Sequence, residues 1–295
     1  MNDFILSCSS TADLTKKQMD LRDIHYVCFH FLLDGQDYAD DMGQSLSSEE
    51  LFQRMTAGAE TQTSQVPLAE YIQYFEKLLQ EGKDILHIEF SSGLSGSYNS
   101  ALLATQELAE KYPERKIYVV DSLAASSGYG LIMETLADMR DSGKSIEELY
   151  HWIENNKLHM HHWFFSTDLT FYVKGGRISK TAGMVGSILN ICPLLNVDNV
   201  GKLNPREKLR GKKKVIQRIV EMMEQHAENG LNYSGKCYIC HSVCPEDATT
   251  VAALVEKKFP HLQEKVQIYP IGATIGSHTG PGTLALFFWG DERKD

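Results

Sequence analysis

The sequence predicts an α/β protein with two domains, an N-terminal domain built around a mostly parallel sheet of βαβ units and a C-terminal α+β domain. In the first half, short apolar segments alternate regularly with segments of helical spacing. In the second half, similar segments follow in a less regular order. Short, continuously apolar strands are typical of a parallel sheet covered by helices on both faces. We expect the first domain to span residues 1–156 and the second residues 157–295.

The first half contains a series of expected strands, each followed by a helix-forming segment. Ser47 with Glu50 three residues later is a capping signature for a helix. Pro67 stands where a helix can begin, and the apolar spacing of residues 68–80 suits one. The strands are expected at residues 4–7, 26–31, 85–90 and 117–120.

The second half mixes strands and helices. Residues 236–243 alternate in the manner of a strand, whereas residues 215–226 have the apolar spacing of an amphipathic helix. Pro245 begins another helix, which is expected to run to residue 259. Further strands are expected at residues 266–269 and 285–289, and the small apolar segment at residues 184–195 is expected to be helical.

The composition is that of a soluble globular protein. A formal net charge of −10 disfavours nucleic acid as the main partner. No apolar run approaches the roughly 18 residues of a membrane span, and the first residues lack the basic start and long apolar core of a signal peptide. We therefore expect a cytoplasmic protein in which the six cysteines are thiols.

The most informative segment is residues 85–101, ILHIEFSSGLSGSYNSA. It begins as a strand, passes through a turn of serine and glycine, and continues as a helix. The first N–H groups of a helix have no partners within the helix, and the helix dipole favours negative charge there. The segment therefore predicts that an anion binds at this strand–turn–helix junction, or that a serine in the turn attacks a substrate.

Five segments together resemble one protein family. They are TSQVP at residues 63–67, SSGLSGSY at 91–98, DSLAASSG at 121–128, KGGRIS at 174–179 and IGSHTGPG at 275–282. In this order they are similar to the DegV family of bacterial fatty-acid-binding proteins, some of which are carrier subunits of fatty acid kinase. The resemblance covers nearly the whole chain.

The resemblance implies a long-chain fatty acid in an apolar tunnel between the two domains. It implies that the carboxylate is held by Thr63, Ser95, His278, Thr279 and Arg177. A separate kinase subunit would phosphorylate that carboxylate, so the chain itself would be a lipid carrier without catalysis, cofactor or metal.

Basic residues near the middle of the second half are implicated by the resemblance in docking the kinase. Here they are Arg206 and Arg210, in a basic run at residues 206–214 that we expect to be the exposed start of a helix. The same positive patch could bring the chain into transient contact with an anionic membrane surface.

The tail of the ligand would supply most of the affinity. An acyl chain of about 14 methylenes offers roughly 11 kcal/mol of burial at ~0.8 kcal/mol each, before the costs of ordering. The apolar run at residues 184–189, together with Ile191, Leu194 and Leu195, is expected to line the tunnel or to be ordinary core.

Two alternatives stay open. The turn GLSGS resembles the nucleophile elbow of a hydrolase, so Ser95 with His278 and an acid such as Asp121 could cleave acyl esters. The segment CYICH has the spelling of a covalent haem attachment, and it offers Cys237, Cys240 and His241, with the later Cys244, as ligands of zinc. In a strand these cysteines would point to opposite faces, so we expect no metal site there.

Overall fold

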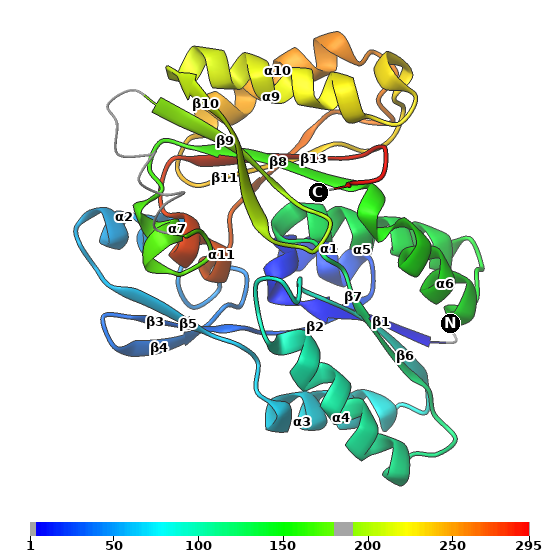
Figure 1. Ribbon diagram of the computed structural model, residues 1–295. Coiled ribbons are helices and arrows are strands. Elements are labelled where there is room, and N and C mark those ends of the chain that lie inside the picture. Colours follow the sequence, from blue (N-terminus) through cyan, green and yellow to red (C-terminus); the bar gives the residue numbers. More distant parts are fainter. Residues whose placement is uncertain (1–3, 180–190, 295) are drawn as a thin grey trace.

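The computed structural model describes residues 4–179 and 191–294. Its strands form three sheets, which Figure 1 shows in the lower and upper halves of the molecule. Sheet A contains the strands expected in a parallel arrangement, sheet B is a small antiparallel sheet, and sheet C is a larger mixed sheet. The mixed α/β architecture agrees with the fold class that the sequence predicts.

Sheet A is parallel throughout and has the order β2-β1-β6-β7. Its strands are β1 (Phe4–Ser9), β2 (Ile24–Val27), β6 (Asp84–Glu89) and β7 (Ile117–Asp121). Helices cover both faces, as continuously apolar strands require. Figure 1 shows α3 and α4 on one face and α1, α5 and α6 on the other. These helices are α1 (Lys16–Leu21), α3 (Leu68–Leu79), α4 (Ser97–Lys111), α5 (Ser126–Asp141) and α6 (Ile146–Asn156).

The prediction of one strand at residues 26–31 is wrong, because these residues divide between sheet A and sheet B. The chain leaves β2 at Val27 and starts a new strand, β3 (His30–Leu33), which pairs with β4 (Gln36–Ala39) and β5 (Thr61–Ser64). Asp34 and Gly35 connect β3 to β4, with φ of 52° and 82°. Two successive residues with positive φ are the requirement of a tight hairpin turn, and an Asp-Gly pair satisfies it.

The helix α2 (Ser48–Thr56) lies between β4 and β5 in the sequence and begins where the capping signature predicts. The Ser47 hydroxyl accepts a hydrogen bond from the Glu50 N–H at 3.1 Å. The helix buries Leu51, Phe52 and Met55 on one face.

Sheet C has the order β10-β9-β8-β13-β11-β12. Its strands are β8 (Met160–Ser166), β9 (Ile191–Val197), β10 (Leu203–Arg210), β11 (Tyr238–His241), β12 (Gln267–Pro270) and β13 (Thr283–Trp289). Figure 1 shows α9 (Lys212–His226) and α10 (Pro245–Lys258) across its outer face. The inner face turns toward α5 and sheet A, because α5 contacts β8, β11 and β13.

Two expectations for the second half are wrong. Residues 191–195 belong to strand β9 rather than to a helix, while residues 184–190 of the expected helix lie outside the described residues. The basic run does not begin a helix either, since Arg206 and Arg210 lie on strand β10 and α9 starts only at Lys212. Gly211, with φ of 92°, makes the turn between them.

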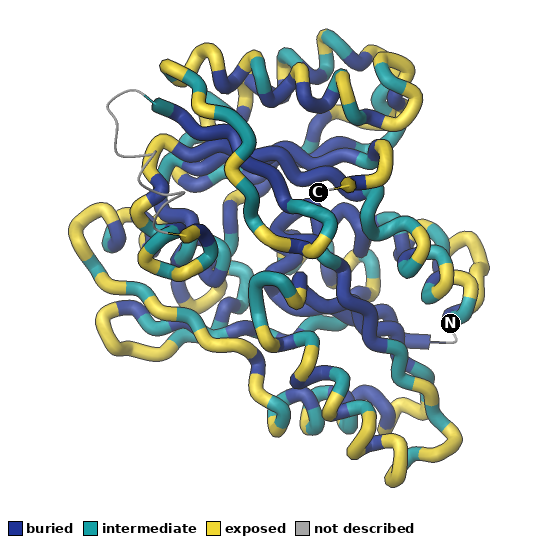
Figure 2. The backbone as a smooth tube through the Cα atoms, in the orientation of Figure 1, coloured by how far each residue is buried: buried dark blue, intermediate teal, exposed yellow. Residues whose placement is uncertain are grey.

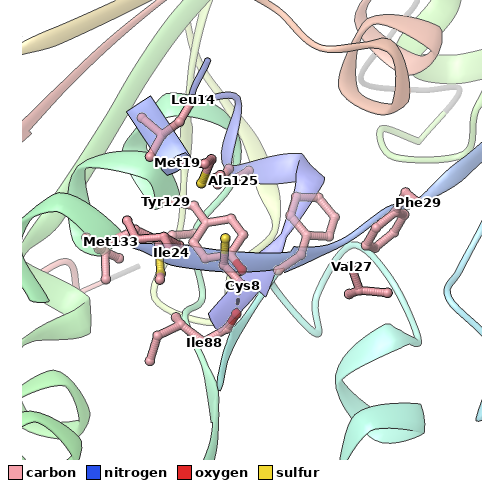
Figure 3. Close-up of a cluster of buried hydrophobic side chains, with 14 of the residues drawn as sticks. Cys8, Leu14, Met19, Ile24, Val27, Phe29, Ile88, Ala125, Tyr129 and Met133 are labelled. Atoms are coloured by element: carbon pink, nitrogen blue, oxygen red, sulfur yellow. Dashed lines mark hydrogen bonds between the residues drawn. The ribbon is translucent and has the colours of Figure 1, made fainter. Parts of the chain in front are cut away.

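The largest buried cluster extends from sheet A through α5 to the inner face of sheet C. It contains Leu86 of β6, Tyr129 of α5 and Phe287 of β13. Figure 2 shows the strands of both sheets as buried and the outer helix surfaces as exposed. In Figure 3, Tyr129 lies beside Cys8 and Ile88, and its hydroxyl donates to the Ile88 carbonyl.

The helix α11 (Ala273–Thr279) connects the two halves of the chain. It is late in the sequence, yet it packs against α2, β3 and β5 of the first half. The domain boundary at residue 156 therefore stays a prediction. Within the described residues, no helix combines the length and apolarity needed to cross a membrane.

Candidate functional site

A cavity of about 560 Å³ lies between the carboxyl ends of the sheet A strands, the inner face of sheet C and α11. Phe29 and Phe90 follow strands β2 and β6 of sheet A, which is the edge where ligands of open α/β sheets bind. Most of the wall is apolar. Among the described residues, the apolar lining comprises Phe29, Phe90, Leu94, Ala125, Phe164, Val197, Leu203, Ile271, Ile275, Ala285 and Phe287.

The five residues that the resemblance implies for carboxylate binding all line this cavity: Thr63, Ser95, Arg177, His278 and Thr279. They come from distant parts of the chain, namely β5, the turn before α4, the segment after α7 (Thr170–Lys174), and α11. The fold therefore brings these five residues to one cavity. Their role in binding stays a prediction.

His278 is the centre of this polar group. Its Nε2 lies 2.6 Å from the Thr63 hydroxyl oxygen. Burial, helped by the neighbouring positive charge of Arg177, lowers the pKa of His278 to about 4. The imidazole is therefore neutral near pH 7. Its Nδ1 is buried without a hydrogen-bond partner in the part of the chain that the structure describes.

The lowered pKa of His278 has a consequence for acid stability. Between about pH 6.5 and pH 4 the unfolded state binds a proton at this residue and the folded state does not, so stability rises with pH. On lowering the pH from 8 to 5, His278 alone is expected to cost about 2 kcal/mol of unfolding free energy. Urea denaturation at both pH values measures it. The variant His278→Gln has no titrating group at this position, so its unfolding free energy should fall by about 2 kcal/mol less between pH 8 and pH 5 than that of the wild type. An equal fall in both proteins would contradict the lowered pKa of His278.

Ser95 makes local hydrogen bonds at the start of α4. Its hydroxyl accepts from the Ser97 N–H at 3.2 Å and lies 3.0 Å from the Ser97 hydroxyl. It is half-buried on the cavity wall, so it can bond to the helix start and still face a ligand.

The hydrolase triad does not form in the described structure. His278 pairs with Thr63 rather than with Ser95. Asp121 accepts from the N–H groups of Ser92 and Leu123, at 3.1 and 3.0 Å, and so shapes the neighbouring turns. A nucleophilic serine needs a base within hydrogen-bond reach and an acid that orients that base. The contacts of these residues supply neither.

Arg177 ties the turn after α7 to the turn before α4. It donates to the Gly175 carbonyl at 2.7 Å and to the Leu94 carbonyl at 3.0 Å. Partial burial lowers the pKa of the guanidinium, which nevertheless stays charged. A fixed positive charge beside a neutral imidazole favours an anionic ligand group at this end of the cavity.

The structure adds Thr274 to this set. It lies one helical turn before His278 on α11 and lines the cavity, and its N–H donates to the Asp40 carboxylate at 3.1 Å. The hydroxyl oxygen of Thr279 is buried without a partner among the described residues. The spacing of four residues would have indicated that Thr274 shares a face with His278, but only if the segment had been expected to be helical rather than a bend.

Further polar residues line the cavity away from this group. Ser126 donates to the Asp13 carboxylate at 2.5 Å and lies 3.2 Å from the Cys240 sulfur. His162 accepts from the Ala125 N–H at 3.2 Å, and its other ring nitrogen lies 3.1 Å from the Met160 carbonyl oxygen. These groups are hydrogen-bonded to protein, unlike the hydroxyl of Thr279.

The expected tunnel lining is only partly testable. Residues 184–189 lie outside the described residues. Leu194 and Leu195 are buried in the packed core, and neither they nor Ile191 is among the described residues of the cavity wall. Val197 and Leu203, at the far end of the β9–β10 hairpin, line it instead.

The cysteines do not form a common site. Cys240 faces the cavity side of β11, whereas Cys237 lies in the cluster beneath α9 and α10 on the opposite face. Burial raises the pKa of both thiols, and that of Cys244 to about 12. Neutral thiols on opposite faces of one strand cannot bind one metal ion together.

The comparisons with known proteins agree on one family. The model of the DegV family, described as uncharacterised proteins, matches residues 8–291. A DegV domain-containing protein of Clostridium perfringens is 39% identical over 294 residues, which covers 100% of both chains. Another, from Streptococcus pyogenes serotype M3, is 34% identical and covers 99% of both chains.

Solved structures of similar fold include fatty-acid-binding proteins. A DegV family protein from Thermus thermophilus, described for its fatty acid binding, has a TM-score of 0.86 at 26% identity and covers 99% of this chain and 100% of its own. The Streptococcus pneumoniae fatty acid kinase B3 protein, loaded with linoleic acid, has a TM-score of 0.85 at 25% identity, with the same coverage.

Proposed function

Because this chain belongs to the DegV family, we propose that it binds a long-chain fatty acid in the cavity between sheets A and C and presents the carboxylate to a fatty acid kinase. The chain acts as a lipid carrier, and the kinase subunit catalyses the phosphoryl transfer. The proposal includes no reaction catalysed by this chain.

One observation carries the proposal: the cavity is apolar over most of its wall and polar where Thr63, Ser95, Arg177 and α11 meet. Buried polar groups are normally hydrogen-bonded. Here the hydroxyl of Thr279 has no partner among the described residues. A ligand with a long apolar tail and one polar end would satisfy both the apolar wall and this hydroxyl.

The polar group suits a carboxylate rather than a neutral head group. Hydroxyl donors and a guanidinium together satisfy a buried carboxylate, which would otherwise cost several kcal/mol. His278 is neutral, so the guanidinium of Arg177 is the full positive charge in this group. The head group therefore fixes the orientation of the ligand, while burial of the tail supplies most of the affinity.

A second hollow gives access to the polar group from outside. It encloses about 440 Å³ and shares Thr63, Arg177 and His278 with the cavity. Lys174 and Glu60 stand on its wall, paired at 3.2 Å. We propose that the kinase reaches the carboxylate from this side.

Lipid extraction tests the proposal. Protein purified after expression in bacteria is expected to release close to one equivalent of long-chain fatty acid into organic solvent, as measured by mass spectrometry. The delipidated protein should take up a fluorescent fatty acid and release it when oleate is added. A folded, delipidated protein that takes up no acyl chain would overturn the proposal.

The kinase is proposed to contact strand β10. Arg210 is exposed near the end of this strand, and Arg206 donates to the Asn196 side chain at 2.8 Å. Reversing the charge with Arg210→Glu is expected to lower kcat/KM for phosphorylation of the bound fatty acid by at least tenfold. Complementary charges on two proteins speed their association and fix their relative orientation, and the variant would remove that complementarity. Phosphate transfer from ATP, with the kinase subunit added, measures it.

The matched control is Lys17→Glu on helix α1, an equal change of charge at an exposed lysine elsewhere in the molecule. Fatty acid binding should be unchanged in both variants. An equal loss of phosphorylation in both would show a general charge effect and would contradict docking at β10. Transient contact of the same basic strand with a membrane stays a prediction.

A further inference from the structure

Three segments of the second half meet on the side of sheet C that faces away from the cavity. His161 is on β8, His226 is the last residue of α9, and Asp291 follows β13. His161 and the cavity-lining His162 are neighbours on a strand, so their side chains point to opposite faces. The cluster is therefore separate from the proposed lipid site.

The main chain fixes these segments against one another. The Asp291 N–H donates to the His226 carbonyl at 2.9 Å, and the Gly290 N–H donates to the His159 carbonyl at 2.8 Å. Ala227 and Gly290 form an isolated antiparallel bridge. The three side chains thus start from positions that main-chain hydrogen bonds hold in place.

One carboxylate oxygen joins both imidazoles. Asp291 Oδ1 lies 3.0 Å from His161 Nε2 and 3.1 Å from His226 Nδ1, and the three atoms lie within 4.8 Å of one another. Ligands bound to one ion at about 2.0–2.2 Å are themselves roughly 3 Å apart. The carboxylate–imidazole separations thus already match those around a bound ion.

The rings are held by aromatic neighbours. The centroids of His161 and His226 are 5.0 Å apart, with 23° between their planes. Phe288 stacks on His161 at 5.2 Å, and Trp163 stacks on His226 at 5.6 Å. Two imidazoles on one ion with bonds near 2 Å place their centroids about 5 Å apart. The stacking therefore keeps both rings at a spacing that an ion can bridge.

We propose that His161, His226 and Asp291 form a binding site for a divalent transition-metal ion of the zinc class. Two imidazoles and one carboxylate are a ligand set for Zn²⁺, Co²⁺ or Ni²⁺, whereas Ca²⁺ and Mg²⁺ prefer oxygen ligands. Because Asp291 is 60% exposed and His161 only 4%, the ion enters from the Asp291 side, where water completes its coordination.

Two neighbouring groups tune the site. The His161 Nε2 lies 2.8 Å from the main-chain oxygen of Asp291, a hydrogen bond that a bound ion would replace. The buried guanidinium of Arg293 donates to the Asp198 and Leu123 carbonyls, and its positive charge opposes a cation nearby. The site therefore binds its ion reversibly instead of holding it permanently.

The test uses the full chain and two variants of the cluster. Isothermal titration with Zn²⁺, and visible absorption on titration with Co²⁺, should both report one ion per chain. His226→Ala and Asp291→Asn are each expected to weaken the affinity at least tenfold. The control is His30→Ala, which removes a histidine that contacts Glu70 at 3.2 Å elsewhere in the molecule and should bind as the wild type does.

Each outcome decides the proposal. Loss of binding in the two cluster variants with unchanged binding in the control supports it. Equal affinity in the wild type and both cluster variants would place the ion elsewhere and overturn it, as would the absence of any titratable ion in the folded wild type. Fatty acid uptake should be the same in all variants, because the cluster is on the opposite face of sheet C.

Discussion

Replacing Gly175 by alanine is expected to lower the affinity for a fatty acid by about 10- to 100-fold. A Cβ atom at this position would lie 2.1 Å from Nδ1 of His278. The backbone there is helical, with φ of −76°, so alanine fits the main chain and only the imidazole has to move. Movement of the ring breaks its 2.6 Å contact with Thr63 and removes both groups from the proposed head-group site. Hydrogen bonds to charged groups contribute about 1.5–3 kcal/mol each.

The neighbouring glycine supplies the matched control. Gly176 has φ of 72°, which strains any other residue, but a Cβ there would meet no atom within 4 Å. Gly176→Ala is therefore expected to lower the free energy of unfolding by about 1 kcal/mol while leaving fatty acid affinity unchanged. Gly175→Ala should instead lower the fatty acid affinity and leave the free energy of unfolding unchanged. Fluorescent fatty acid titration and urea denaturation of both variants separate the effects, and equal affinities in the two would contradict a role for His278.

The members of the candidate site were expected from the resemblance to one family, whose motifs in this chain are short segments of small and polar residues. Ser95 and Arg177 lie in turns, where such segments are informative about ligands. Thr63 was found in the same way, although its strand β5 was not expected. The contact between Thr63 and His278 joins residues 215 positions apart. No local pattern predicts that contact, because it depends on how α11 packs against sheet B.

The secondary structure was predictable where the spacing of apolar residues was clear, and the prediction was wrong where that spacing was ambiguous. The strands of sheet A are short apolar runs with helices between them, and β1, β6 and β7 were expected close to their observed bounds. The strand expected at residues 26–31 instead divides between β2 and β3. Residues 191–195, ICPLL, are apolar throughout, so periodicity cannot distinguish a buried strand from a buried helix. Pro193 was a usable signal against a helix, because proline breaks the interior of one.

The prediction of a helix start in the basic run at residues 206–214 was wrong for a different reason. Its charge suggested an exposed surface, which is correct for Arg210, but the alternation of Arg206, Lys208 and Arg210 has the period of a strand. Charge predicts exposure and not secondary structure. The hairpin at Asp34 likewise had a signal, because the Asp-Gly pair that follows the apolar residues 31–33 is typical of a tight turn.

Replacing Glu89 by alanine is expected to lower the free energy of unfolding by about 3–5 kcal/mol. Glu89 is fully buried at the end of β6, beneath the turn that carries Ser95. Its carboxylate lies 2.8 Å from His87 Nε2 and accepts from the Ser9 hydroxyl at 3.2 Å, from its neighbour's N–H on Phe90 at 2.9 Å, and from the Tyr71 hydroxyl. Truncation leaves all of these buried polar groups without their acceptor, which is the costly way to break such a network.

The buried position decides the size of this effect, and Glu76 shows why. Glu76 also accepts hydrogen bonds, from Lys111 and from Tyr112, but it lies at the surface of α3, where water replaces a lost acceptor. Glu76→Ala is therefore expected to lower the free energy of unfolding far less than Glu89→Ala does. Urea denaturation of both variants at pH 7 makes the comparison. Because Phe90 is the first residue after β6 and lines the cavity, Glu89→Ala should also weaken fatty acid uptake, and a variant as stable as Glu76→Ala would show that the network does not support the site.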